Sequence, residues 1–162
     1  MDVLWAGWRS AYMTEVQQGV DSDACLFCEL PEAGDEAVYI LERGEAAYSV
    51  LNLYPYTSGH LMITPFRHVG APGDMTSQEQ ADVWRLLARS QAALDAVVGP
   101  HGYNLGVNQG RAGGAGVLGH FHLHVVPRWT GDANFMTATA NARILPEALA
   151  DTWRRLRDEL AD

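Results

Sequence analysis

Hydrophobic and polar residues alternate with helical periodicity in two stretches of the chain. The first starts at Thr76, where Thr76-x-x-Glu79 forms a capping box in which a hydroxyl and a carboxylate each satisfy an orphan backbone N–H. Apolar residues then recur every three or four positions until Gly99-Pro100; they are Ala81, Trp84, Leu87, Ala88, Leu94 and Val98. A second helix is predicted at about residues 146–160, with an apolar stripe of Leu149, Trp153, Leu156 and Leu160.

Five further segments have the short, apolar or alternating pattern of strands. They are residues 37–41, 46–53, 60–64, 103–108 and 121–126. Turn-forming residues separate them, and the connection 109–119 contains five glycines, which suits either a ligand-binding loop or a mobile surface connection. The order of strands and helices predicts an α+β fold with an antiparallel sheet. The segment that carries Trp5, Trp8 and Tyr12 is predicted to form a short helix or an arm packed on this fold.

Length and composition narrow the class of protein. A chain of 162 residues with 48% hydrophobic and 19% charged residues predicts one folded domain over 1–162. Eleven Lys and Arg against twenty Asp and Glu give a net charge of −9, too few cations to displace counterions from a nucleic acid. The chain has no apolar run near the ~18 residues that a membrane span needs, and its start lacks the pattern of a signal peptide. We therefore expect a cytoplasmic protein that binds neither nucleic acid nor membrane.

The two cysteines stand in the order Cys25-Leu26-Phe27-Cys28. This spacing is typical of half a zinc site or of a redox pair, and a reducing cytoplasm argues against a permanent disulfide. Taken alone, the pair is interpreted equally well as half of a metal site or as two ordinary thiols.

Three of the six histidines lie within five residues, at His120, His122 and His124. Alternate side chains of a strand share one face, so a strand at 121–126 would place these rings about 6.6 Å apart, at ~3.3 Å per residue. Such a row can bind a metal, relay protons, or present one nucleophilic nitrogen beside two supporting rings. The opposite, core-facing side would consist of Phe121, Leu123 and Val125.

The run from His120 to Val126 resembles the motif of the histidine triad (HIT) family. Segment 51–65 looks like the nucleoside-binding strands of this family, and 104–108 looks like its phosphate-side segment. Segment 127–135 is similar to a bacterial branch of diadenosine tetraphosphate phosphorylases and hydrolases. The resemblance implies a HIT-like antiparallel sheet of about five strands with one long helix and a C-terminal helix. It also implies a single HIT domain over 1–162, made of an N-terminal zinc-clip segment (about 1–36), a catalytic core (about 37–136) and the C-terminal helix (about 146–160).

The resemblance implies that His122 is the nucleophile, which attacks the α-phosphorus of a dinucleoside polyphosphate such as diadenosine tetraphosphate and forms a nucleotidyl-histidine intermediate. His124 and His60 would bind phosphate oxygens or assist the leaving group. Substrate-binding roles are implied for Asn52 at the ribose, for Asn108 and the amides near Gly116 at the phosphates, and for Trp129 as a wall or stacking surface for the base or the second nucleoside. Many family members carry Gln or Ser where this chain has Gly116, which puts the acceptor, water or phosphate, in question.

The resemblance also gives the cysteines partners. In many bacterial members a Cys-x-x-Cys pair binds zinc with two histidines, and the matching residues here are Cys25, Cys28, His68 and His120. Two thiolates and two imidazoles form a closed tetrahedral set of the structural kind, the alternative being reduced thiols without metal. His120 would then belong to the scaffold and not to catalysis.

The sequence is also compatible with two other functions. One alternative is a hydrolase of nucleoside phosphoramidates or adenylylated small molecules, because the same nucleophile can cleave either. A second is a nucleotide-binding, zinc-stabilised interaction module with little catalysis. We expect a small-molecule nucleotide as the partner, and a homodimer is implied by the resemblance alone.

Overall fold

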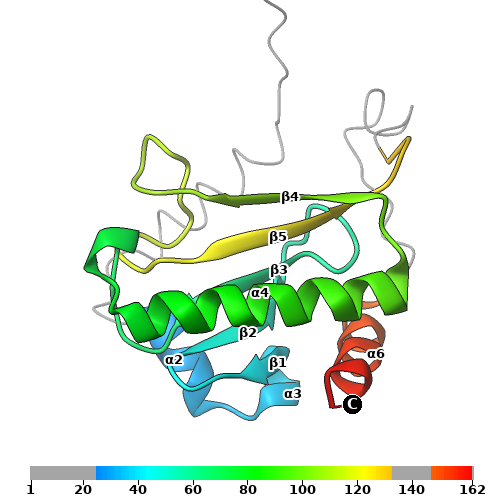
Figure 1. Cartoon of the computed structure of the whole chain (residues 1–162), viewed down its shortest axis with the longest axis horizontal. Coiled ribbons are helices and arrows are strands. Elements are labelled where there is room, and N and C mark those ends of the chain that lie inside the picture. The colour runs from blue at the N-terminus through cyan, green and yellow to red at the C-terminus, as the bar shows by residue number, and fades with distance from the viewer. Residues whose placement is uncertain (1–24, 133–146, 162) are drawn as a thin grey trace, which may run out of the picture.

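A five-stranded antiparallel sheet forms the centre of the protein, which is described by a computed structural model over residues 25–132 and 147–161. The strands are β1 (Ile40–Arg43), β2 (Ala47–Leu51), β3 (Leu61–Pro65), β4 (Gly102–Val107) and β5 (Leu123–Arg128), in the order β1-β2-β3-β5-β4. The long helix α4 (Ser77–Val98) crosses one face of this sheet, and α6 (Leu149–Ala161) lies beside it (Figure 1). The predicted α+β fold is confirmed.

The start of the described chain differs from the prediction. The segment before β1 forms two short helices, α2 (Leu26–Glu29) and α3 (Asp35–Val38), with the 3-10 turn η1 (Leu30–Glu32) between them. The strand predicted at 37–41 begins only at Ile40, because α3 continues until Tyr39 ends it in the left-handed conformation at φ 61°. The strand also continues through Glu42 and Arg43, where a turn was predicted. Arg43 donates to Asp35 at 2.8 Å, which holds α3 against the strand.

Helix α4 has the predicted capping box, preceded by the 3-10 turn η2 (Pro72–Asp74). The Thr76 hydroxyl accepts from the Glu79 N–H at 3.2 Å, and the Glu79 carboxylate accepts from the Thr76 N–H at 2.7 Å. Its buried face is rotated from the predicted stripe: Ala81, Trp84 and Ala88 are exposed, and the apolar residues buried on this helix are Val83, Leu86, Leu87, Ala93 and Leu94. The rotation places Asp82, also buried, against the β1–β2 turn.

Alternating residues of the strands face two different layers. On the side of α4 and α6, Leu61 and Ile63 of β3 and their β5 partners Val125 and Leu123 belong to the main hydrophobic core. The residues between them face the other side, where Met62 pairs with His124. A smaller cluster on this side packs Ile40, Tyr48 and Val50 against Leu30, Val38, Met62 and Phe66. His124 of β5 therefore faces away from α4.

The strand with the histidine motif starts later than predicted, at Leu123 instead of Phe121, so only His124 lies within it. His120 and His122 belong to the segment before β5, which two hydrogen bonds hold. The Phe121 N–H donates to the Val69 carbonyl at 2.6 Å, and the Thr64 hydroxyl donates to the Phe121 carbonyl at 2.7 Å. Phe121, Leu123 and Val125 lie in the core as predicted.

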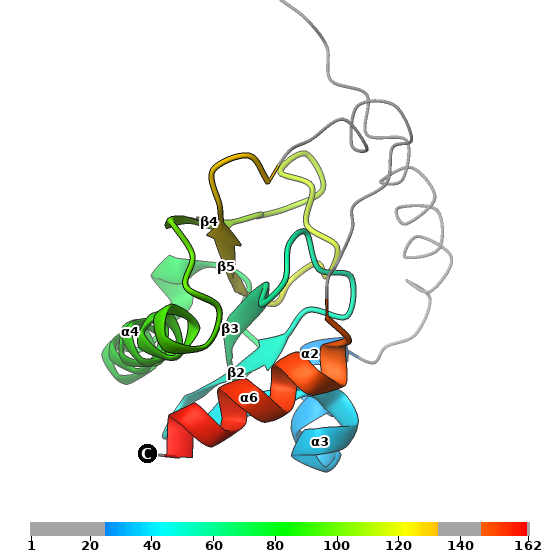
Figure 2. The ribbon, with the colours of Figure 1, turned by 90° about the vertical axis from the view of Figure 1, so that its right-hand side faces the viewer.

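Helix α6, orange to red in Figure 2, packs against α4 and against β1 at one edge of the sheet. Its predicted apolar stripe is confirmed: Leu156 is buried, and Leu149, Trp153 and Leu160 pack against the core. The Trp153 indole N–H donates to the Ile40 carbonyl at 2.9 Å. Across 25–132 and 147–161, no helix has the length and apolarity to cross a bilayer. Trp5, Trp8, Tyr12 and most of the predicted zinc-clip segment lie outside the described residues, and the predicted extent of the single domain, 1–162, stays a prediction.

Candidate functional site

A cluster of four potential metal ligands joins helix α2 to the segment before β5. The ligand atoms of Cys25, Cys28, His68 and His120 all lie within 4.8 Å of one another. The His120 Nδ1 lies 3.2 Å from the Cys25 sulfur and 3.5 Å from the Cys28 sulfur, and the His68 Nδ1 lies 3.5 Å from the Cys28 sulfur. The sequence separates the first and last of these residues by 95 positions, and the fold brings them together.

The geometry of His120 fits metal binding. Its Nε2 lies 2.9 Å from the Pro65 carbonyl, and because a carbonyl only accepts, Nε2 carries the proton. The lone pair is then on Nδ1, which faces the two sulfurs, as expected of a metal-binding histidine whose other nitrogen is held by a carbonyl. Burial, followed by the hydrogen bond and charge of the neighbouring Cys25, raises the pKa of the Cys28 thiol, so the Cys28 sulfur stays protonated until a cation compensates its charge.

Two contacts set the position of the histidines in this cluster. Arg67, the residue before His68, donates two hydrogen bonds to the Glu79 carboxylate, at 2.8 and 2.7 Å, and so ties the loop after β3 to the start of α4. On the other side, Gly119 precedes His120 with φ 74°, a conformation that favours glycine. A Cβ at Gly119 would lie 3.5 Å from the His68 Nε2, so the two ligand-bearing segments run close to one another.

His122 is buried beside this cluster, with 3% of its surface exposed. Its Nδ1 lies 2.9 Å from the His120 carbonyl, and therefore donates a proton to it, which leaves the lone pair on Nε2. Burial lowers the pKa of His122, so the ring is neutral near pH 7. A neutral imidazole with a lone pair on Nε2 is a competent nucleophile.

His122 is held between two rings. The ring of Phe27 lies on one side at a centroid distance of 4.9 Å, and His124 meets it edge-on at 5.0 Å. Phe27 is almost fully buried, and its carbonyl accepts from the Tyr48 hydroxyl at 2.6 Å. Helix α2, which carries Phe27 between the two cysteines, thus packs directly on His122.

A second chain of hydrogen bonds runs through His60 and His124. The Tyr56 N–H donates to the His60 Nδ1 at 3.0 Å, so the proton of this neutral, fully buried ring is on Nε2. The His60 Nε2 lies 3.0 Å from the His124 Nδ1, which accepts from it. A neutral His124 then carries its own proton on Nε2. These hydrogen bonds therefore make the His124 Nε2–H a hydrogen-bond donor.

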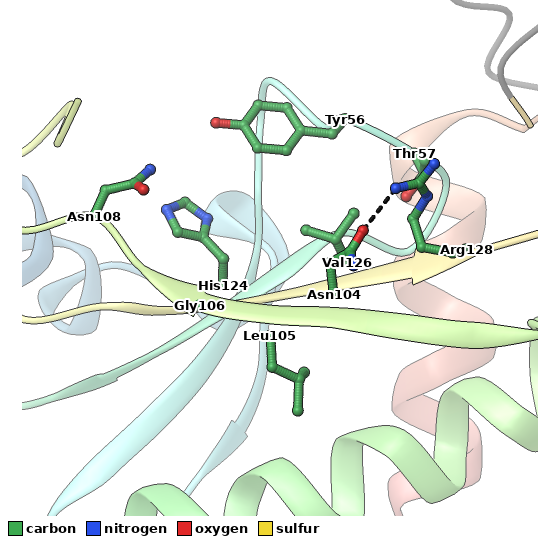
Figure 3. A pocket seen from close by; sticks show the side chains of 9 residues that line it. All are labelled: Tyr56, Thr57, Asn104, Leu105, Gly106, Asn108, His124, Val126 and Arg128. Carbon is green, nitrogen blue, oxygen red and sulfur yellow. Dashed lines mark hydrogen bonds between the residues drawn. The ribbon is translucent and has the colours of Figure 1, made fainter. Parts of the chain in front are cut away.

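His124 lines a pocket of about 230 Å³ on the face of the sheet opposite α4 (Figure 3). The floor is made by alternate residues of two paired strands: His124, Val126 and Arg128 of β5, and Asn104 and Gly106 of β4. The side chain of Leu105 points away, to the other face (Figure 3). The remaining lining residues are Tyr56, Thr57 and Asn108. The pocket thus opens next to the histidine that acts as a donor.

Comparison with known proteins decides the family. The family model "HIT domain" matches residues 33–131, more than half of the chain. The chain belongs to the HIT domain family. It is 40% identical, over 98% of its length and 84% of the relative's, to a Mycobacterium tuberculosis protein named AP-4-A phosphorylase.

Solved structures agree with this assignment. A Zn-bound histidine triad family protein from Mycobacterium smegmatis is 28% identical and superposes with a TM-score of 0.68, over 85% of this chain and 94% of that one. A uridylyltransferase shares the fold, with a TM-score of 0.73 and 20% identity over 95% of this chain and 52% of that one.

The remaining predicted site residues of this HIT domain lie at different distances from the histidines. The Asn52 amide nitrogen lies 3.4 Å from the His60 Nδ1, and its oxygen accepts from the Tyr54 N–H at 3.0 Å. Asn108 lines the pocket with His124. Gly116 is partly buried in the loop between β4 and β5. Trp129 does not line this pocket, and its indole N–H donates to the Gly99 carbonyl at 3.2 Å.

Sequence reasoning missed three residues of the site. Phe27 stands between the two cysteines, so a metal-binding interpretation of that pair already places it near the motif histidines. Tyr56 orients His60 through its backbone N–H, which leaves no trace in the side-chain pattern. Asn104 joins the site through the pairing of β4 with β5, where it lies opposite Val126. Asn104 and Asn108 are four residues apart, so a strand over this segment places both side chains on the same face, and the sequence indicated Asn104 in that way.

Proposed function

We propose that this HIT-family protein is an enzyme that cleaves dinucleoside polyphosphates, such as diadenosine tetraphosphate, at an α-phosphate through a nucleotidyl-histidine intermediate on His122. The observation that carries this proposal is the orientation of His122, whose Nδ1 donates to the His120 carbonyl and whose Nε2 has the lone pair. The 40% identical relative named AP-4-A phosphorylase supports the choice of substrate.

In the first step, the lone pair of the His122 Nε2 attacks the α-phosphorus, and the bond from phosphorus to the bridging oxygen breaks. The electron pair of that bond goes to the leaving nucleotide. Positive charge develops on the imidazole as the P–N bond forms, and the His120 carbonyl stabilises it through the hydrogen bond at Nδ1. Dividing one difficult displacement into two easier ones is the advantage of covalent catalysis.

His124 is proposed to assist the leaving nucleotide. Its Nε2–H would donate to the bridging oxygen as negative charge appears there, and the His60 Nε2–H, at 3.0 Å from the His124 Nδ1, fixes the ring in the required tautomer. In the second step, phosphate or water attacks the phosphorus, the P–N bond breaks, and the electron pair returns to the His122 Nε2.

Binding roles are proposed for four further residues. Asn108 and backbone amides near Gly116 would bind phosphate oxygens, and Asn52 would bind the ribose hydroxyls next to His60. Trp129 stays a candidate wall for a base. Backbone amides can bind a small polyphosphate without a basic surface, which is compatible with the net charge of −9.

We infer that the four-residue cluster holds zinc as a structural ion. Two sulfurs and two imidazoles form the donor set that structural zinc prefers, and the Zn-bound relative from M. smegmatis supports this choice. Bound there, the metal would supply a cross-link between α2 and the segment that leads to His122. The chemistry at phosphorus would stay with the histidines.

A homodimer in the cytoplasm is also proposed. The support is the position of β4, which among the described strands lies at the edge of the sheet beside β5, and which exposes 45% of Leu105 and 37% of Val107. Light scattering coupled to size-exclusion chromatography tests the dimer: a mass near 35 kDa, twice the 17.7 kDa of the chain, supports it, and a mass near 18 kDa contradicts it.

Turnover of diadenosine tetraphosphate with and without inorganic phosphate tests the proposed function. ADP and ATP as products would identify a phosphorylase, and AMP and ATP a hydrolase. The covalent step is tested with His122→Asn, and with His101→Asn as a matched control because His101 is exposed in the turn after α4. Loss of turnover in the first variant alone supports the mechanism. Full activity of His122→Asn would refute it, as would nucleotide binding without turnover by the unchanged protein.

A further inference from the structure

The pocket beside His124 lies over a position of β4 that has no side chain. Gly106 pairs directly with His124, and a Cβ built at Gly106 meets no atom within 4 Å. The neighbouring positions on this face, Asn104 and Asn108, carry side chains that close the hollow at both ends (Figure 3). The hollow thus starts next to the proposed leaving-group donor and extends along the sheet toward Arg128.

At the far end of the pocket, Arg128, Asn104 and Asp132 form a hydrogen-bonded group that fixes their side chains. The Arg128 guanidinium donates to the Asn104 Oδ1 at 2.6 Å (Figure 3) and to both oxygens of Asp132, at 2.6 and 2.8 Å. Because the Asn104 oxygen already accepts from arginine, the amide is oriented, and its Nδ2 is the donor that it can offer a ligand. The geometry at Asn104 is therefore set before any ligand arrives.

The charge balance of the pocket favours a nucleoside over a phosphate chain at this end. The positive charge of Arg128 is matched by the Asp132 carboxylate in a two-bond ion pair, which raises the pKa of Arg128. What remains for a ligand is a neutral amide, the Thr57 side chain, and the apolar surface of Val126 and the Tyr56 ring. A flat, uncharged group with hydrogen-bonding edges fits that lining.

The distances along β5 also fit a nucleoside at this end of the pocket. Along β5, Val126 and Arg128 follow His124 by two and four residues, about 7 and 13 Å at ~3.3 Å per residue. A leaving nucleotide whose bridging oxygen is at His124 has its phosphates over Gly106 and its nucleoside near Asn104. We propose that this pocket is the subsite for the nucleoside of the leaving nucleotide, with Asn104 as the residue that recognises it. This inference rests on the proposed function.

Two substrates with the same phosphate chain test the subsite: diadenosine tetraphosphate, and adenosine 5′-tetraphosphate, which lacks the second nucleoside. Asn104→Leu keeps the size of the side chain and removes the amide. We expect kcat/KM to fall about tenfold for diadenosine tetraphosphate, the loss of about one hydrogen bond, and less than twofold for adenosine tetraphosphate. The matched control is Gly102→Ala, on the same face of β4 and outside the pocket, which should change neither value.

Equal losses for both substrates, or no loss for either, would overturn the subsite while the proposed function stands. Failure of the unchanged protein to turn over either substrate would count against the proposed function instead. In that case calorimetry with ATP and with inorganic tripolyphosphate decides on the pocket: Asn104→Leu should weaken ATP binding and leave tripolyphosphate binding unchanged. Equal effects on the two ligands would show that the pocket does not recognise a nucleoside.

Discussion

Gly44, in the turn between β1 and β2, is predicted to be essential for stability because a side chain at this position would collide with a buried carboxylate. Asp82 of α4 accepts from the backbone N–H groups of Ala46 and Ala47 at 2.8 and 2.9 Å and from Arg85 at 2.9 Å. A Cβ at Gly44 would overlap the Asp82 Oδ2 and lie 2.7 Å from both the Oδ1 and an Arg85 nitrogen. Gly44→Ala must therefore displace the carboxylate.

The expected decrease in the free energy of unfolding follows from the hydrogen bonds that Asp82 loses. Hydrogen bonds to a charged group contribute about 1.5–3 kcal/mol each, and the displaced carboxylate loses the two to the turn. The Arg85 contact is partly exposed and adds little. We expect the free energy of unfolding to fall by about 3 kcal/mol, which at about 2–4 °C per kcal/mol for a chain of this length lowers Tm by about 6–12 °C.

Thermal and urea denaturation followed by circular dichroism would measure this change. Gly73→Ala is the matched control, because a Cβ at Gly73 meets nothing within 4 Å, and its effect should stay within about 0.5 kcal/mol. A double-mutant cycle isolates the contact: in an Asp82→Ala background, Gly44→Ala should cost less than about 1 kcal/mol. Equal costs in both backgrounds, or equal effects of the two glycine substitutions, would refute the reasoning.

Three further predictions concern the site and its support. His122→Asn should lower kcat for diadenosine tetraphosphate at least about a thousandfold with Tm little changed, measured by product chromatography and calorimetry; a small loss of kcat would contradict the nucleophile assignment. Cys28→Ser should lower the amount of bound zinc measured by mass spectrometry, and a chelator should lower the Tm of the unchanged protein but not of the variant. Full zinc content in Cys28→Ser would argue against the cluster as the zinc site. The hydrogen bonds from Arg67 hold the pKa of Glu79 at about 2, below its ordinary value near 4.3, so Glu79 stabilises the fold above about pH 4.3 and loses this effect as pH falls toward 2. The Tm difference between the unchanged protein and Glu79→Gln should shrink over that range, and a constant difference would show that the Glu79 charge is not responsible.

Local patterns predicted the elements whose cause is local. The capping box at Thr76 and Glu79 and the stripe of α6 depend on neighbours three or four residues away, and both are present. The stripe of α4 was predicted about one residue out of phase, because Trp84 is as apolar as the buried positions but faces outward. Only the partner elements decide which side of a long helix is covered.

The site was predictable to the extent that motifs encode it. The resemblance to the HIT family indicated which residues belong to the cluster, His68 included, and the four ligand atoms lie together in the structure. The start of β5 was not predictable, because the hydrogen bonds of Phe121 with Val69 and Thr64 replace strand pairing there. The pocket at Gly106 arises from the register of β4 on β5, and a single sequence does not contain that register.

The strand order has a consequence for how the protein acquires its site during folding. β5 inserts between β3 and β4, and it pairs with Leu61–Ile63, about sixty residues earlier in the chain. The cysteines meet His120 only after a still larger loop has closed. Long-range contacts of this kind form late, because their loop entropy must be offset by structure already present. A ribosome that has synthesised the chain through α4 has therefore made β1, β2 and β3 without His122 and His124, and nucleophile, donor and metal ligands come together in one late event.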